Sequence, residues 1–237
     1  MPNGTVDPRD LLKAGARAAA VAPREDLGVR NIVVSVKAGS VFDLVDLAAR
    51  IPGAEYSKRG FPGLILHISR PKCAALAFSN GKLIVTGLDN VDTIAPSLSA
   101  VLEVLRTAGA IIEDDPPARV VNMVLSGSLG AVVALLQVVI ATNLERVEYE
   151  PETFPGLIYR SETGPVVLVF ASGALVVSGA MSVDQGQAAA AEVRHMIDTA
   201  GAWGSNPRPR PGPSDFLHTH KKSAAEDRMS RSAGPPG

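Results

Sequence analysis

Four phenylalanines recur in pairs along the chain, the second pair about 92 residues after the first. Phe61 and Phe154 each open a Phe-Pro-Gly turn, and Phe78 and Phe170 each stand just before a glycine-containing turn. Aromatic residues make up only 4% of the chain, so four of its six phenylalanines in register are informative. A single Phe more often packs in a core, but paired apolar wedges at symmetric loops can unstack base steps from the minor groove.

Two asparagines recur at the same spacing. Asn31 and Asn122 are expected to open the first strand of each half, where a twofold axis would bring them together. An amide can donate to adenine N3 or thymine O2, the acceptors of the minor groove. Nearby residues would form an apolar and hydroxyl floor that leaves the guanine amino group without a partner, which favours A·T steps: Val33, Ile84, Thr86, Val124, Val176 and Ser178. Strand propensity alone explains these β-branched types but not the paired Asn.

These residues lie in a body that repeats itself. Five landmarks recur in one order at an offset of 91 to 93: residues 30–33, 55–56, 61–65, 78–81 and 85–87 match 121–124, 148–149, 154–158, 170–173 and 177–179. The pattern predicts the same elements in each half: a strand, a short helix, three strands and a closing helix. In the first half these are 31–36, 41–50, 64–69, 74–78, 83–86 and 93–107. In the second half they are 120–125, 131–141, 157–160, 166–170, 175–178 and 183–199. We therefore expect an α+β fold, a pseudo-twofold repeat of two β-α-β-β-β-β-α halves that form one wide antiparallel sheet.

Composition divides the chain of 237 residues and limits its class. We expect an N-terminal extension at 1–27 with a short Ala-rich helix at 11–21, a first repeat at 28–112, an acidic and Pro-containing linker at 113–118, a second repeat at 119–203 and a disordered tail at 204–237. The net charge of residues 28–203 is −4, which excludes a uniformly basic nucleic-acid binder. One cysteine, Cys73, excludes an internal disulfide, and no apolar stretch is long enough to span a bilayer, so we expect a soluble, intracellular protein.

The most specific stretch of sequence is Tyr149-Glu150-Pro151-Glu152-Thr153-Phe154-Pro155-Gly156-Leu157-Ile158-Tyr159-Arg160. It resembles a strand–loop–strand segment of the TATA-binding protein family, and residues 31–33, 78–82 and 85–87 are similar to the first-repeat motifs of that family. The resemblance covers about residues 29–201. It implies a curved saddle with helices on the convex face, in which all four Phe kink promoter DNA and both Asn lie at the centre. The family is itself the type example of such kinking.

The resemblance also implies partners, namely double-stranded promoter DNA, transcription factor B and, through it, RNA polymerase. It thereby implies the role of a general transcription initiation factor, located in the cytoplasm at the nucleoid, or in the nucleus if the source is eukaryotic. The residues implied for transcription factor B are Glu148, Glu150 and Glu152. Residues 57–59 of the first half carry the opposite charge, which could orient a partner. Candidate phosphate contacts are Lys58, Arg59, Arg70, Lys72, Lys82 and Arg160. Ala174 replaces the counterpart of Lys82, and His67 stands where the second half has Arg160, which predicts weaker binding and a shallower salt dependence.

Other functions stay open at this point. A divergent paralogue could keep the saddle and act as a decoy or protein-interaction platform without sequence-specific DNA binding. An enzyme is disfavoured, because no P-loop, G-x-G-x-x-G, G-x-S-x-G or H-E-x-x-H pattern occurs and no acid–base pair is expected on the concave face. We expect no cofactor and no metal; His218 and His220 in the tail are a weak metal candidate. Cys73 and Trp203 are expected to pack. The exposed concave face leaves a homodimer of the DNA-free protein possible.

Overall fold

The computed structural model describes residues 26–57, 59–143 and 145–204. They form a nine-stranded antiparallel sheet with the strand order β2-β3-β4-β1-β5-β9-β8-β7-β6. The first repeat contains β1 (Asp26–Lys37), α2 (Leu44–Arg50), β2 (Gly63–Ser69), β3 (Lys72–Phe78), β4 (Lys82–Leu88), the 3-10 turn η1 (Val91–Thr93) and α3 (Ile94–Thr107). The second contains β5 (Ala118–Ser128), α4 (Leu135–Thr142), β6 (Val147–Glu148), β7 (Gly156–Arg160), β8 (Val166–Phe170), β9 (Ala174–Ala180) and α5 (Val183–Ala200).

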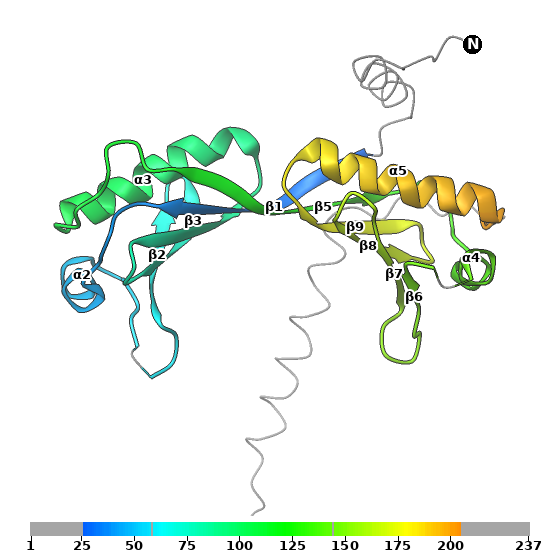
Figure 1. Cartoon of the computed structure of the whole chain (residues 1–237), viewed down its shortest axis with the longest axis horizontal. Helices are drawn as coiled ribbons and strands as arrows, with labels where there is room; N and C mark the ends of the chain where they lie inside the picture. Colours follow the sequence, from blue (N-terminus) through cyan, green and yellow to red (C-terminus); the bar gives the residue numbers. More distant parts are fainter. Residues whose placement is uncertain (1–25, 58, 144, 205–237) are drawn as a thin grey trace, which may run out of the picture.

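The sheet forms an arch with one covered and one open face. In Figure 1, α3 and α5 run along the upper side, while two loops extend below from the ends of the sheet. Alternation along the strands gives each face its character: in β4, Leu83 and Val85 are fully buried under the helices, whereas Ile84 and Thr86 are half-buried on the open side. The predicted α+β saddle with helices on its convex face is confirmed.

The two repeats meet at the centre, where β1 pairs antiparallel with β5. Each of these strands also pairs with the last strand of its own repeat, β1 with β4 and β5 with β9. The second repeat has the predicted β-α-β-β-β-β-α order, in which β6 is the strand for which no residue range was predicted. In the first repeat the counterpart of β6 is reduced to a single bridge between Glu55 and Ile65.

Two helix starts differ from the prediction. Helix α2 begins at Leu44 rather than at 41, because Asp43 caps it: the carboxylate oxygen Oδ1 accepts from the N–H groups of Val45 and Asp46, both at 3.0 Å. Helix α4 begins at Leu135 rather than at 131, because Val133 is bridged to Trp203 and its N–H donates to the carbonyl of Ala171. Long-range backbone bonds therefore outweigh the local helical pattern at 131–134.

The first strand of each repeat is longer than predicted, since β1 begins at Asp26 and β5 at Ala118. Both are long because they pair with each other over almost their whole length, from Asp26–Ser128 to Val36–Ala118. The predictions for the N-terminal extension and the C-terminal tail, including His218 and His220, fall outside the described residues except at 26–27 and 204. The division of the chain into repeats, linker and tails stays a prediction.

Candidate nucleic-acid interface

Asn31 and Asn122 lie diagonally across the central β1–β5 ladder, one on either side of the Ile32–Met123 pair. In the β1–β5 ladder Asn31 faces Val124, and Val33 faces Asn122. The prediction that the two asparagines meet near the twofold axis is confirmed. The prediction that they open their strands is wrong: both lie inside their strands, which extend further to pair across the centre.

The protein fixes both carboxamides by their oxygens. Asn31 Oδ1 accepts from the Gly87 N–H at 2.9 Å and from the Thr86 hydroxyl at 3.2 Å, and Asn122 Oδ1 accepts from the Gly179 N–H at 2.9 Å. Gly87 and Gly179 have φ values of 84° and 90°, a conformation that glycine adopts without strain. Since each oxygen is engaged, each NH2 group is the part of the amide that can donate to a ligand.

The predicted floor surrounds the asparagines. Its members lie on the four central strands β4, β1, β5 and β9, and each is half-buried on the open face: Val33, Ile84, Thr86, Val124, Val176 and Ser178. Pairing makes the surface continuous, since Ile84 neighbours Leu76 of β3 and Val176 neighbours Leu168 of β8. The face thus offers apolar and hydroxyl groups, with two amide donors in the middle.

The four phenylalanines form two edge-to-face pairs of almost the same geometry. The ring centroids of Phe61 and Phe78 are 5.8 Å apart with an interplanar angle of 63°, and those of Phe154 and Phe170 are 5.7 Å apart at 65°. Phe61 is 38% exposed, and the other three rings are half-buried. A pair therefore stands toward each end of the sheet, partly open to solvent.

The glycine of each Phe-Pro-Gly turn makes room for these rings. Gly63 pairs across the sheet with Phe78, and Gly156 pairs with Phe170. A Cβ atom on Gly63 would lie 2.6 Å from Cε1 of Phe61, and one on Gly156 would lie 2.7 Å from Cε1 of Phe154. The first ring of each pair can thus lie over the strand only because the turn ends in glycine.

The predicted phosphate contacts are less uniform. All of those that the structure describes are exposed. Four lie at strand ends or in the adjoining turn, namely Arg70, Lys72, Lys82 and Arg160. Arg59 lies in the first loop and His67 on β2, while Lys58 lies outside the described residues. Arg160 is already paired: its Nε and Nη2 donate to Glu148 Oε1 at 3.0 and 2.8 Å. Arg160 was predicted to contact DNA and Glu148 to contact a protein, and the structure joins the two.

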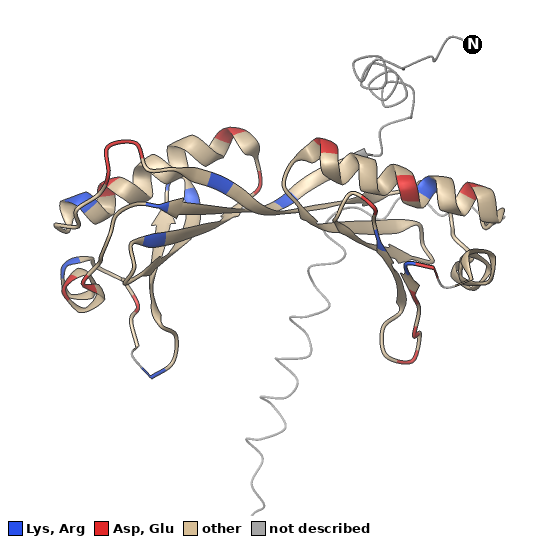
Figure 2. Cartoon of the chain, in the orientation of Figure 1, with Lys and Arg blue, Asp and Glu red and all other residues tan. Residues whose placement is uncertain are grey.

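The loops at the ends of the sheet differ in charge. Glu150 and Glu152 are exposed in the second loop (residues 149–155), which is red at its tip in Figure 2, whereas the first loop (residues 56–62) is blue at its tip. The Glu150 carbonyl accepts from the N–H groups of Thr153 and Phe154, both at 2.9 Å, so the loop is closed by a turn that leads directly into the aromatic pair.

Three cations that the sequence analysis missed lie on the open face. Lys37 is the next residue after Val33 and Ser35 on the same face of β1, so strand alternation alone could have placed it on the open face. Arg119 could not, because a bulge at Val121 shifts the pairing between Val33–Asn122 and Val34–Val120. Arg30 occupies the matching bulge of β1 and donates from Nε to Ser126 Oγ at 2.7 Å.

The remaining predictions concern packing and metals. Cys73 is buried, which confirms its packing role and raises the pKa of its thiol by desolvation. Trp203 packs against the core and donates to Asp198 at 2.6 Å. Within the described ranges no cluster of three or more His, Cys, Asp or Glu could hold a metal ion. The helices described there include none long and apolar enough to cross a membrane.

Known proteins are similar to this chain in sequence and in fold. The sequence model of the family "Transcription factor TFIID (or TATA-binding protein, TBP)" matches residues 26–108 and 117–200. TATA-box-binding protein 2 of Haloferax volcanii is 38% identical over 183 residues, which are 77% of this chain and 98% of that protein. The TATA-box-binding protein of Haloarcula marismortui is 42% identical over 67% of this chain and 86% of its own length.

The structure of the Methanococcus jannaschii TBP gives a TM-score of 0.65 at 34% identity, with 76% of this chain and 99% of that chain covered. The family match spans both repeats and the relatives are covered almost from end to end. The chain therefore belongs to the TATA-binding protein family, a family of transcription factors and not of enzymes.

Proposed function

We propose that the open face binds A/T-rich promoter DNA in the minor groove. The observation that carries the proposal is the pair of matched aromatic couples, 5.8 and 5.7 Å between centroids, at symmetric places on a face otherwise lined by apolar and hydroxyl groups. Phe61, Phe78, Phe154 and Phe170 would wedge between base steps at the two ends of the footprint, the mode for which this family is the type example. The names of the relatives support the same ligand.

In this proposal the centre of the face reads the bases. The NH2 groups of Asn31 and Asn122 donate to adenine N3 or thymine O2. The surrounding floor is mostly aliphatic, so burial of a guanine N2 amino group against it without a hydrogen-bond partner would be costly. Lys82 and Arg160 contact phosphates. Binding to the bases is then strongest where A·T steps meet the two amides.

The second loop is proposed as the binding site for transcription factor B, and through it for RNA polymerase. Glu150 and Glu152 are exposed there and suit a basic surface. Glu148 contributes less to such a surface, because Arg160 already neutralises it. A homodimer of the DNA-free protein would cover the same open face as DNA and would compete with it.

The experiment is a fluorescence-anisotropy titration of the full chain with a TATA-like duplex and a G·C-rich duplex, each at several salt concentrations, since an affinity without its salt is uninterpretable. A clear preference for the TATA-like duplex supports the proposal. Equal affinity at every salt concentration, from a protein with the expected circular dichroism, contradicts it and favours the alternative of a decoy or interaction platform. Repeating the titration with transcription factor B tests the second loop.

A further inference from the structure

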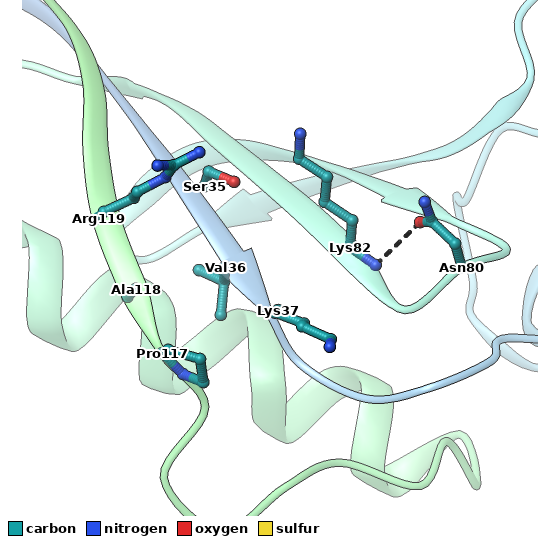
Figure 3. A pocket seen from close by; sticks show the side chains of 8 residues that line it. All are labelled: Ser35, Val36, Lys37, Asn80, Lys82, Pro117, Ala118 and Arg119. Carbon is teal, nitrogen blue, oxygen red and sulfur yellow. Dashed lines mark hydrogen bonds between the residues drawn. The ribbon is translucent and has the colours of Figure 1, made fainter.

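The open face carries a basic groove in the first repeat. It has a volume of about 440 Å3 and is lined by Ser35, Lys37, Asn80, Lys82, Pro117 and Arg119, among others. Figure 3 shows the Lys82 and Arg119 side chains extending to the same side of the strands, on either side of Ser35. We infer that Lys37, Lys82 and Arg119 form a phosphate-binding site for the DNA backbone that exists only in the first repeat, an inference that rests on the proposed function.

Strand register brings these cations together. Lys37 of β1 lies directly opposite Lys82 of β4, and Ser35 lies between Ile84 of β4 and Arg119 of β5. Side chains directly opposite in adjacent strands have Cβ atoms about 5 Å apart, and like charges in that position repel. In Figure 3 the Lys37 and Lys82 side chains extend in different directions from their paired strands. A phosphate bound near both lysines lowers the remaining repulsion, since it places an anion close to two cations.

The residues that the structure describes leave the charge of the groove unpaired. All three side chains are exposed, and none of them takes part in a salt bridge among the residues that the structure describes. The acidic residues 113–115 precede Pro117 in the chain but form no such pair with them. The Asn80 carboxamide accepts from the Lys82 N–H at 3.2 Å, which holds the turn that presents the lysine.

The matching place in the second repeat has a different composition. The register is the same, but Ser128 faces Ala174 where Lys37 faces Lys82, and Gly28 faces Ser126 where Arg119 faces Ser35. One cation lies nearby: Arg30, whose guanidinium is 3.3 Å from the position of a Cβ on Gly28 and which donates to Ser126. With three cations at this place in the first repeat and one in the second, phosphates are bound more strongly at the first-repeat end of the face.

The test compares salt dependences of duplex binding. The double variant Lys37→Gln/Arg119→Gln removes two charges from the groove, and the matched control Arg50→Gln/Arg106→Gln removes two from helices α2 and α3. With about 0.9 per phosphate contact, the slope of log affinity against log salt is expected to become shallower by about two in the first variant and to stay unchanged in the control. Equal slopes for the two variants would overturn the inference.

A gain-of-charge variant covers the case in which the first variant folds poorly. Ser128→Lys adds a lysine at the place in the second repeat that matches Lys37, and leaves the buried Ala174 unchanged. The slope is expected to steepen by about one; an unchanged slope counts against the inference. The slope is read on both duplexes, so it reports phosphate contacts whatever the sequence preference. A wild-type chain without TATA preference therefore contradicts the proposed function alone, whereas one that binds neither duplex contradicts both.

Discussion

The two repeats agree on their open face and differ around it. The aromatic pairs, the asparagines held by positive-φ glycines and the bulges at Arg30 and Val121 occur in both halves at matching places. Three features do not match: the charge of the two end loops, the basic groove with Lys37, and the hydrogen bonds from the closing helix to the outer strands. The open face is thus alike in the two halves, while the charges and packing at its margins differ. Substitutions at matched and at divergent positions test this difference.

The largest effect is expected from the aromatic pairs. Phe154→Ala removes one ring of a pair, and its counterpart Phe61→Ala removes the other first-loop ring. If both insert, each loses on the order of 2–3 kcal/mol of binding free energy, about a hundredfold in Kd, and reduces the bend. Affinity is measured by anisotropy and bending by fluorescence energy transfer between duplex ends. A bend that stays at the wild-type value in both variants rules out the wedge.

A divergent position comes next. In the second repeat Glu192 of α5 accepts from the Tyr159 hydroxyl at 3.0 Å, from Ser161 at 2.9 Å and from the Glu162 N–H at 3.0 Å. Glu192→Ala leaves these donors without their acceptor, and we expect unfolding to become easier by about 2 kcal/mol. Denaturant unfolding checks this. The control is Ala100→Ser at the matching place of α3, which should cost far less.

The same network gives a pH dependence. Burial, together with the hydrogen bond to Glu192, raises the pKa of Tyr159 to about 12. The folded protein therefore keeps a phenolic proton that the unfolded chain loses near pH 10, so the free energy of unfolding should fall as the pH rises from about 10 to about 12. The fall should be smaller in Tyr159→Phe. Parallel curves for both proteins over this window would contradict the prediction.

The asparagines test whether matched residues act alike. Asn122→Ala and Asn31→Ala should each reduce the preference for a TATA-like over a G·C-rich duplex by about tenfold, because an amide donor to the bases is lost. Affinity for the G·C-rich duplex should change little. A loss of equal size on both duplexes would mean that these residues support the fold rather than read the bases.

The smallest effect is expected at the Arg160–Glu148 pair, which is exposed and so adds little to stability. Glu148→Gln releases Arg160, and we expect duplex affinity at low salt to rise a few-fold with a slightly steeper salt dependence. Glu152→Gln makes the same charge change in the loop without touching Arg160. Should the two variants behave alike, general charge rather than release of Arg160 is responsible.

Sequence spacing predicted the repeat, the aromatic places and the asparagines because insertions between the halves are small. It failed where pairing decides the outcome. Arg119 reaches the open face only through the bulge at Val121, and Arg160 meets Glu148 only through the β6–β7 hairpin. The predicted start of α4 was wrong because the N–H group of Val133 donates a hydrogen bond to Ala171, a residue distant in sequence. Side-chain types are visible in a sequence, whereas strand register and bulges are settled by tertiary contacts.

The central seam is built like the interface of a symmetric dimer. Asn31 faces Val124 as Asn122 faces Val33, and the bulge of β1 is mirrored in β5. A single repeat with this edge would associate edge to edge with a second copy, and every substitution would then appear at both ends. Joining the two copies in one chain lifts that constraint. The position that is Lys82 in the first half can then be an alanine, Ala174, in the second. A single chain with two repeats can therefore have a surface that differs from one end to the other, whereas a symmetric dimer of one repeat cannot.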